Sequence, residues 1–219
     1  MTGTGQIALL DYEMSNLRSV EKALERLGAR VKVARSPAEA AGALAVVLPG
    51  VGHFGEAMRR VRAHGLDRVV AEAVDAGTPV LGICVGIQLL FESSDEAPGV
   101  AGLGLLPGHV RRLPASGPDG VVRKLPQIGW NTVTWAPGAP LAPLDPNPLS
   151  STYYFVHSFA CEPEDPDHML ATAVYGDTFC AVAGRPGLLG VQFHAEKSSS
   201  AGLGLLASWL GTVQPAIAA

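Results

Sequence analysis

Gly82-Ile83-Cys84-Val85-Gly86 joins two apolar runs, residues 78–81 and residues 87–91. A nucleophile with a small residue two positions away on either side is typical of the sharp strand-to-helix turn of α/β-hydrolases. Glycine suits such a turn because it has no Cβ to clash with the crowded backbone. The turn places Cys84 at a helix N-terminus, where the helix dipole favours the thiolate. The stretch therefore predicts a reactive cysteine between a strand and a helix; a small buried packing residue is the alternative interpretation.

The first half of the chain alternates apolar runs with amphipathic patterns. The runs predict buried strands at residues 6–11, 30–34, 44–48 and 80–83, and the helical spacing predicts helices over residues 17–27, 54–61, 66–74 and after Cys84. Ser15 is expected to cap the first of these helices and Gly28 to end it. Strands that alternate with helices predict an α/β fold with a doubly wound, mostly parallel central sheet flanked by helices.

The second half of the chain changes character. Its β-branched and aromatic runs predict an additional antiparallel layer, with strands in residues 110–135, 152–161, 170–174, 179–183 and 188–193. Residues 136–148 carry five prolines and predict an irregular surface connection. A final helix is expected to start at Ser199 or Ser200. Since no linker is evident, we expect residues 1–219 to form a single domain.

The composition excludes several classes of function. The formal net charge is −4, which gives no electrostatic case for binding nucleic acid or an anionic membrane. The sequence has neither a Cys-x-x-Cys motif nor paired histidines at metal-binding spacing, and no glycine-rich loop for a nucleotide, so we expect no metal and no cofactor. Three cysteines (Cys84, Cys161 and Cys180) indicate a reducing, cytoplasmic protein in which Cys161 and Cys180 are packing residues.

A nucleophilic cysteine needs a base, and His194-Ala195-Glu196 supplies one. In extended backbone, residues i and i+2 point to the same side, so His194 and Glu196 are expected to face one side, with Ala195 on the other. A carboxylate beside an imidazole fixes its tautomer and stabilises the imidazolium that forms when the thiol proton arrives. A partly buried histidine with a nearby surface glutamate is the alternative.

Residues 49–52 (Pro-Gly-Val-Gly) follow a buried strand and predict an oxyanion hole. The backbone N–H groups of Val51 and Gly52 are candidates to stabilise the negative charge of a tetrahedral intermediate. The N–H of Val85, directly after the nucleophile, is the natural further donor. An ordinary turn is the other interpretation of this segment.

These motifs resemble class I (triad) glutamine amidotransferases, in residues 82–88 and residues 193–196. Five further stretches resemble the glutaminase subunits of imidazole glycerol phosphate synthase, an enzyme of histidine biosynthesis. They are residues 11–20 (DYEMSNLRSV), residues 48–52, residues 128–131 (IGWN), residues 153–158 (YYFVHS) and residues 192–199 (QFHAEKSS). The triad motifs specify the class, and the longer stretches specify the subunit.

The resemblance implies roles for individual residues. Cys84 would attack the side-chain amide of glutamine, His194 would carry the proton, and Glu196 would orient His194. Glutamine would be held by Gly52, Gln88, Glu96, Ser158 and Phe159. The implied partner is a separate (β/α)8-barrel cyclase subunit, contacted by Asn16, Tyr154 and Lys197. Ammonia would pass through that barrel to make imidazole glycerol phosphate and aminoimidazole carboxamide ribonucleotide. Residues 49–52 would change conformation when the barrel binds its ligand.

The chain also departs from the family it resembles. Glu13 and Ser15 stand where the family usually has glycine, Ala195 replaces a proline, and Phe159 replaces a common tyrosine. Two alternative functions remain open from the residues. One is a stand-alone Cys-His-Glu γ-glutamyl hydrolase, which would need no partner. The other is a catalytically inactive interaction protein, against which the intact triad argues.

Overall fold

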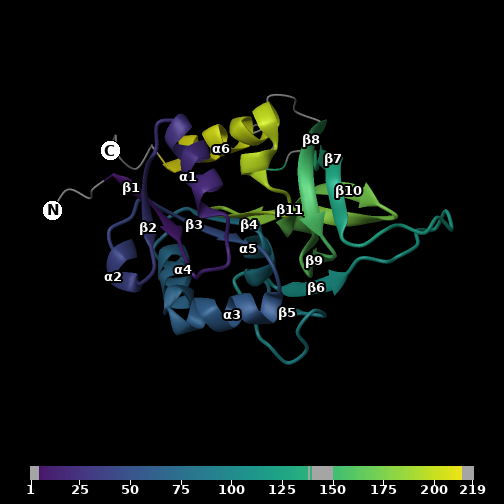
Figure 1. Cartoon of the computed structure of the whole chain (residues 1–219), viewed down its shortest axis with the longest axis horizontal. Helices are drawn as coiled ribbons and strands as arrows, with labels where there is room; N and C mark the ends of the chain where they lie inside the picture. The colour runs from purple at the N-terminus through teal and green to yellow at the C-terminus, as the bar shows by residue number, and fades with distance from the viewer. Residues whose placement is uncertain (1–4, 138, 140–149, 214–219) are drawn as a thin grey trace.

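The computed structural model describes residues 5–137, 139 and 150–213. A parallel sheet forms one half of it. Its strands lie in the order β2-β1-β3-β4-β12 (Figure 1). They are β1 (Gln6–Leu10), β2 (Arg30–Ala34), β3 (Ala45–Gly50), β4 (Val80–Cys84) and β12 (Leu188–Val191). The strands β1, β3, β4 and β12 are apolar and almost completely buried, as expected for parallel strands with helices on both faces.

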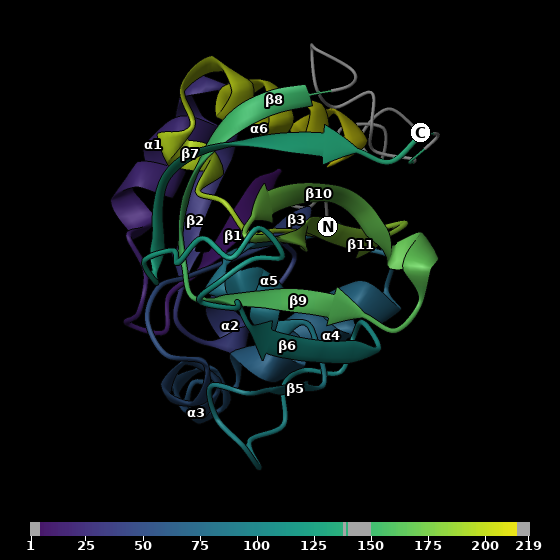
Figure 2. The same cartoon turned by 90° about the vertical axis from the view of Figure 1, so that its right-hand side faces the viewer.

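Antiparallel strands continue the same sheet beyond β12 in the order β11-β10-β7-β8. They are β11 (Asp177–Arg185), β10 (Met169–Tyr175), β7 (Gln127–Trp135) and β8 (Ser150–His157). The strand β11 also pairs with β9 (Phe159–Pro163), which pairs with β6 (Gly108–Arg112), beside the short β5 (Ser93–Ser94). Figure 2 shows the β7–β8 pair above β10 and β11, with β9 and β6 below them.

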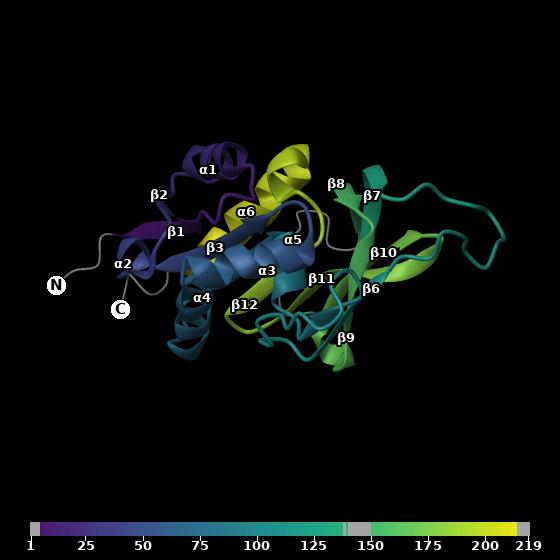
Figure 3. The ribbon, with the colours of Figure 1, turned by 60° about the horizontal axis from the view of Figure 1, so that its bottom comes forward.

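Helices cover both faces of the parallel strands (Figures 1 and 3). One face carries α1 (Leu17–Arg26) and α6 (Ser199–Val213). The other carries α2 (Pro37–Ala40), α3 (Phe54–Ala63), α4 (Leu66–Asp75) and α5 (Val85–Leu89). The predicted α/β fold, with a doubly wound sheet and added antiparallel strands, is confirmed. Within the described residues, no helix is long and apolar enough to cross a membrane.

Local details confirm some predictions and correct others. Gly28 ends α1 as predicted: it has a φ of +86° and donates to the Glu25 carbonyl at 2.9 Å, a geometry that favours glycine. The prediction that Ser15 caps α1 is wrong, because Asn16 is the N-cap residue and makes no side-chain capping bond. The strand predicted over residues 152–161 is interrupted at Ser158, which separates β8 from β9.

Other boundaries differ by a few residues. The strand predicted over residues 188–193 ends at Val191, and the strands in residues 110–135 are β6 and β7, separated by an irregular loop. The final helix starts at Ser199, as expected. Most of the proline-rich connection predicted for residues 136–148 lies outside the described residues.

An aromatic cluster lies where the antiparallel strands meet the parallel ones. Tyr153 stacks on Phe193 with ring centroids 3.9 Å apart, and Phe155 meets the edge of Phe193 at 5.6 Å. All three side chains are completely buried. Because Phe193 directly precedes His194, this packing fixes the backbone from which His194 projects.

Candidate active site

Cys84 lies at a strained turn between β4 and α5. Its φ of +56° and ψ of −109° are conformations that non-glycine residues rarely adopt, and such strain is concentrated at functional sites. Gly82 and Gly86 are required by the crowding around it. A Cβ at Gly82 would lie 2.8 Å from the Gly86 carbonyl, and one at Gly86 would overlap the Leu48 carbonyl oxygen. The predicted strand, turn and helix around Cys84 are therefore confirmed.

His194 and Glu196 meet behind Cys84. The Nδ1–H of His194 donates to Glu196 Oε1 at 2.9 Å, which leaves Nε2 as the ring nitrogen available to Cys84, whose Sγ donates to the Val156 carbonyl at 3.8 Å. The His194 and Glu196 side chains are 5% and 1% exposed. The sequence pattern predicted this contact through an extended backbone over residues 194–196. That explanation is wrong, because residues Ala195–Lys197 form a 3-10 turn (η3). A single 3-10 turn also brings a residue and its second neighbour close enough for this bond.

The backbone of His194 is held by β8. Its N–H donates to the Tyr154 carbonyl at 2.9 Å, and its carbonyl accepts from Ser198 Oγ at 2.6 Å. Ser198 Oγ in turn accepts from the Tyr154 N–H at 2.9 Å. These hydrogen bonds fix the backbone of His194 relative to the sheet. They leave both ring nitrogens of the imidazole free for other contacts.

The surroundings of His194 favour its protonated form. Burial disfavours charge on the ring, but the hydrogen bonds to Cys84 and Glu196 outweigh burial and raise the pKa of His194 to about 9. Glu196 Oε2 is buried and has no hydrogen-bond partner among the described residues. A buried carboxylate with so few partners interacts strongly with an imidazolium beside it. The arrangement can accept a proton from Cys84 and keep it nearby.

A cavity of about 220 Å³ opens in front of Cys84. At about 30 Å³ per water molecule, it has room for roughly seven waters, which suits an amino acid better than a nucleotide. Residues from several elements line it: Val51, Gly52, Cys84, Val85, Gln88, Glu96, Pro126, Val156, His157, Ser158, Phe159 and His194. Every residue proposed from sequence for the oxyanion hole or for glutamine is on this wall. Among the described residues, no group of side chains could hold a metal ion.

Two polar side chains of the cavity are already fixed by hydrogen bonds. Gln88 Nε2 donates to the Phe159 carbonyl at 3.0 Å and to Gln192 Oε1 at 3.1 Å. Glu96 Oε2 accepts from the Phe54 N–H at 2.7 Å, at the first residue of α3. The site is thus rigid on the Gln88 side, and its one cavity carboxylate is anchored at a helix N-terminus.

The predicted oxyanion hole is only partly in place. The Val51 N–H donates to the Met14 carbonyl at 2.8 Å, on the side of β1, and does not point into the cavity. Because the C=O and N–H of a trans peptide point in opposite directions, the Gly50 carbonyl points toward β4, where Gly50 pairs with Cys84. A carbonyl oxygen at this position would oppose a developing oxyanion, and the Val51 N–H could act as the predicted donor only after rotation of the Gly50–Val51 peptide.

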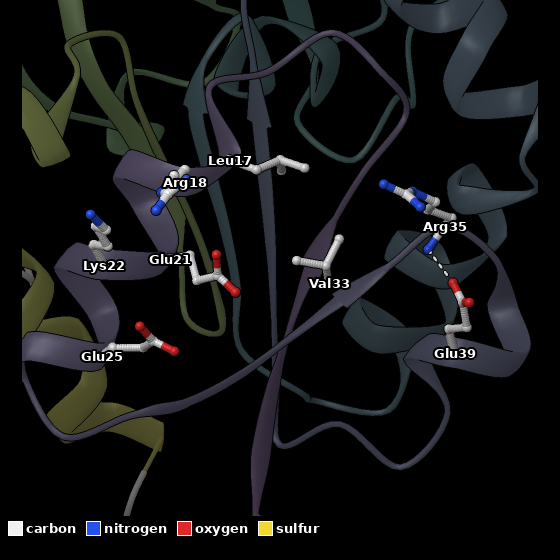
Figure 4. A pocket seen from close by; sticks show the side chains of 8 residues that line it. All are labelled: Leu17, Arg18, Glu21, Lys22, Glu25, Val33, Arg35 and Glu39. Carbon is white, nitrogen blue, oxygen red and sulfur yellow. Dashed lines mark hydrogen bonds between the residues drawn. The ribbon is translucent and has the colours of Figure 1, made fainter.

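A larger hollow of about 590 Å³ lies between α1 and β2, away from Cys84. Figure 4 shows charged side chains of both signs around it. Its lining residues are Leu17, Arg18, Glu21, Lys22, Glu25, Val33, Arg35 and Glu39. None of them was predicted to be catalytic, and neither a cysteine nor a histidine is among them. The cavity at Cys84, although smaller, is lined by a nucleophile and a base, Cys84 and His194, and is therefore the candidate active site.

The comparisons with known proteins agree with this geometry. The model of the family "Glutamine amidotransferase class-I" matches residues 8–208. The chain belongs to the class-I glutamine amidotransferases. Among curated amidotransferases of this family, it is 49% identical over 204 residues to the imidazole glycerol phosphate synthase subunit HisH of Symbiobacterium thermophilum, covering 93% of this chain and 92% of that protein. The HisH subunit of Halalkalibacterium halodurans is 43% identical over 213 residues, covering 97% and 99%.

Solved structures show that the amidotransferase fold is shared well beyond these relatives. A crystal structure of a glutamine amidotransferase matches with a TM-score of 0.72 at 21% identity, covering 95% of this chain and 99% of that one. The structure of PurLQS from Thermotoga maritima matches with a TM-score of 0.71 at 16% identity, covering 97% and 98%. With HisH relatives this similar over nearly their full length, the chain is an enzyme, a glutaminase subunit of the HisH type.

Sequence reasoning missed His157 in this amidotransferase. His157 lines the cavity, and its Nδ1–H donates to the Phe159 carbonyl at 2.9 Å, while Nε2 lies 3.1 Å from the Gln127 side-chain amide. Burial lowers the pKa of His157 to about 4, so the ring is neutral. The alternation of Tyr153, Phe155 and His157 along β8 was a usable signal, because it places His157 on the buried face.

The residues proposed to contact a partner lie together on the surface beside this site. Asn16 is exposed at the start of α1, Lys197 is exposed in η3, and Tyr154 is partly buried in β8. The helix α1 and the strand β8 both pack against η3, which joins these positions into one surface next to His194. The role of these residues in contacting a partner stays a prediction.

Proposed function

We propose that this amidotransferase hydrolyses glutamine at Cys84 and delivers the ammonia to the cyclase subunit of imidazole glycerol phosphate synthase, in the cytoplasm. The observation that carries the proposal is that Cys84 and His194 line an amino-acid-sized cavity while Glu196 bonds to His194 from outside it. HisH relatives that cover nearly the whole chain support it. All three cysteines are free, which suits a reducing compartment.

The reaction proceeds through a thioester. The Cys84 thiol first gives its proton to His194 Nε2, and the resulting Cys84 thiolate attacks the amide carbon of glutamine. When the tetrahedral intermediate collapses, the C–N bond breaks and His194 returns the proton to the leaving nitrogen, which departs as ammonia. His194 then takes a proton from a water molecule that attacks the thioester, and glutamate leaves as Cys84 recovers its proton. Glu196 keeps Nδ1 protonated throughout, so Nε2 does the proton transfer.

The remaining cavity residues hold the substrate. The Glu96 carboxylate would bind the α-ammonium group of glutamine, which the position of Glu96 on the cavity wall supports, and Gln88 is held by the Phe159 carbonyl. The N–H of Gly52 is a donor at the mouth of the cavity. Phe159, where a tyrosine is common, contributes its backbone and not a hydroxyl. These residues orient the amide carbon toward Cys84.

The resting geometry implies control by the partner. The Gly50 carbonyl faces the position of the oxyanion, while the Val51 N–H is held by Met14. We expect the peptide between Gly50 and Val51 to rotate when a loaded cyclase binds, which turns the Val51 N–H toward the cavity and completes the oxyanion hole with Val85. Coupling of this kind keeps the lone subunit slow and prevents loss of ammonia.

An apolar surface supports docking of the cyclase barrel next to the site. Ile128 and Trp130 in β7 are 62% and 54% exposed, and Trp130 meets the ring of Tyr154 edge-on with centroids 5.9 Å apart. Exposed aromatic residues of this kind are typical of protein interfaces. Asn16 and Lys197 supply polar groups at its rim. Ammonia released at Cys84 leaves on this side, into the (β/α)8 barrel.

Replacement of Cys84 by alanine tests the proposal. The Cys84→Ala variant is expected to release no ammonia from glutamine, with a loss of at least about 10⁴-fold, because no other group can form the thioester. It should bind the cyclase subunit as the wild type does, since Cys84 is 3% exposed and lies inside the cavity. Ammonia release and binding are measured on the same samples. Glutaminase activity retained by Cys84→Ala would contradict the assignment.

A further inference from the structure

Tyr12 carries a buried hydroxyl group that the mechanism above does not use. Tyr12 follows β1 and is completely buried. Its hydroxyl oxygen has no hydrogen-bond partner among the described residues. A buried hydroxyl without a partner is destabilising, because it gives up its hydrogen bonds to water and gains none in the protein. Such a group deserves an explanation, and for Tyr12 the neighbouring peptide supplies one.

The hydroxyl lies against the peptide that has to rotate. A Cβ at Gly50 would overlap the Tyr12 hydroxyl oxygen, and it would lie 3.0 Å from Val85 Cβ and 3.3 Å from the Gly86 N–H nitrogen. The hydroxyl is therefore packed between the end of β3 and the start of α5, beside the place where the oxyanion develops. Burial raises the pKa of Tyr12, and the charge of Cys84 raises it further, so the phenol stays protonated and can donate.

Rotation of the Gly50–Val51 peptide leaves the Gly50 carbonyl oxygen in need of a hydrogen-bond donor. In the resting state the Val51 N–H satisfies the Met14 carbonyl, and the Gly50 carbonyl points toward Cys84. Rotation sends the N–H into the cavity and swings the Gly50 carbonyl to the β1 side. That side then holds two carbonyl oxygens, those of Met14 and Gly50, and the Met14 carbonyl has lost the Val51 N–H.

We propose that Tyr12 is a positioning residue whose hydroxyl donates to the Gly50 carbonyl once the peptide has rotated, and so holds the oxyanion hole in its active form. The inference rests on the proposed function and names the group that stabilises its activated state. The resting state keeps the phenol unpartnered, and the rotated state pairs it. Tyr12 thereby lowers the free-energy difference between the two states without touching glutamine.

Tyr12→Phe is the test, and Ser15→Ala is the matched control. Ser15 belongs to the same loop and also has a buried hydroxyl without a partner among the described residues, but no contact places it at Gly50. Each variant is assayed for glutamine hydrolysis alone and in complex with the cyclase subunit and its ribonucleotide ligand. Thermal unfolding of the free variants is measured as well.

Tyr12→Phe is expected to lower the stimulated kcat and the ratio of stimulated to basal rate about tenfold, a typical effect of one lost hydrogen bond in an active state. The KM for glutamine stays within about twofold, because Tyr12 is outside the cavity wall. The midpoint of thermal unfolding does not fall, since the resting state loses only an unpartnered hydroxyl. Ser15→Ala keeps the wild-type stimulation.

Three results would overturn the inference. They are wild-type stimulation in Tyr12→Phe, an equal loss of basal and stimulated rates together with a lower unfolding midpoint, and a loss of stimulation in Ser15→Ala but not in Tyr12→Phe. Failure of the proposed function looks different, because the wild-type complex itself would then show no stimulation by the loaded cyclase.

Discussion

At the scale of the residue, the site depends on two histidines held in opposite states of charge. Burial acts against charge on both, but His194 also bonds to Cys84 and Glu196, and its pKa rises to about 9. His157 has no carboxylate beside it and faces the charge of His194, so its pKa falls to about 4. A neutral His157 keeps its Nδ1–H on the Phe159 carbonyl, which also accepts from Gln88.

The neutral His157 makes stability depend on pH. Between pH 6.5 and about 4, an unfolded chain binds a proton at this residue and the folded chain does not, so the free energy of unfolding falls as the pH falls. At about 1.4 kcal/mol per pH unit, the loss amounts to about 3 kcal/mol. Denaturant unfolding of wild type and His157→Asn across this range measures it. An asparagine side chain does not titrate, so the variant should lack this part of the slope; an unchanged slope would contradict the neutral buried histidine.

Short motifs made most of the site predictable at this scale. Cys84 and Gln88 stand in residues 82–88, and His194 stands in residues 193–196, a second motif far away in sequence, whereas Glu96 followed only from the resemblance to the family. The alternation along β8 places His157 on the buried face, but its neutral state also depends on packing against Phe179 and on contact with Gln127, which are distant in sequence. The direction of the Gly50–Val51 peptide was also out of reach, since both directions fit the same residues.

Glu13 shows how a departure from the family is accommodated. Its φ is +66°, a conformation that favours the glycine usually found there. The backbone N–H donates to Asp11 Oδ1 at 2.9 Å, and the side chain pairs with Arg60 at 2.6 Å. These contacts keep the loop before α1 in place, including Met14, whose carbonyl holds Val51.

At the scale of the element, the 3-10 turn η3 depends on the start of α6. Gly202 lies in the first turns of α6, and a Cβ there would overlap the Ala195 carbonyl oxygen and lie 2.8 Å from Ser198 Cβ. Both atoms belong to the segment that carries His194 and Glu196. The close approach of α6 therefore sets the position of the catalytic pair.

Two glycines of α6 give a matched comparison. Gly202→Ala is expected to lower the free energy of unfolding by about 1–3 kcal/mol through the clash, and to lower kcat by moving Glu196. Gly211 is exposed with open space around it, so Gly211→Ala should raise stability by about 0.5–1 kcal/mol. Chemical denaturation and glutaminase assays measure both. A stabilising Gly202→Ala would show that η3 does not need this contact.

Elements with strong periodicity were predictable, and short ones were not. The helices α1, α3 and α4 and the strands β1 to β4 follow from apolar spacing over their whole length. In contrast, η3 spans three residues and has no period to detect. The break between β8 and β9 at Ser158 interrupts a continuous β-rich run, and it creates the turn whose backbone holds Gln88.

At the scale of the whole molecule, the site lies where the parallel and antiparallel parts of one sheet meet. The strands β3 and β4 bring residues 49–52 and Cys84 to the same edge, β12 delivers His194, and β8 and β9 close the cavity. The parallel half was predictable from its alternation of strands and helices. The continuation into antiparallel strands depends on long-range pairing, so the sequence indicated the strands without their order.

The rate of glutamine hydrolysis, measured for the purified chain alone and with the cyclase subunit and its ribonucleotide ligand, tests the central claim most directly. The resting peptide, with Val51 held by Met14 and the Gly50 carbonyl facing the oxyanion, predicts a slow basal rate and a stimulation of at least about tenfold by the loaded partner. Equal rates with and without the partner would contradict the account and favour a stand-alone γ-glutamyl hydrolase.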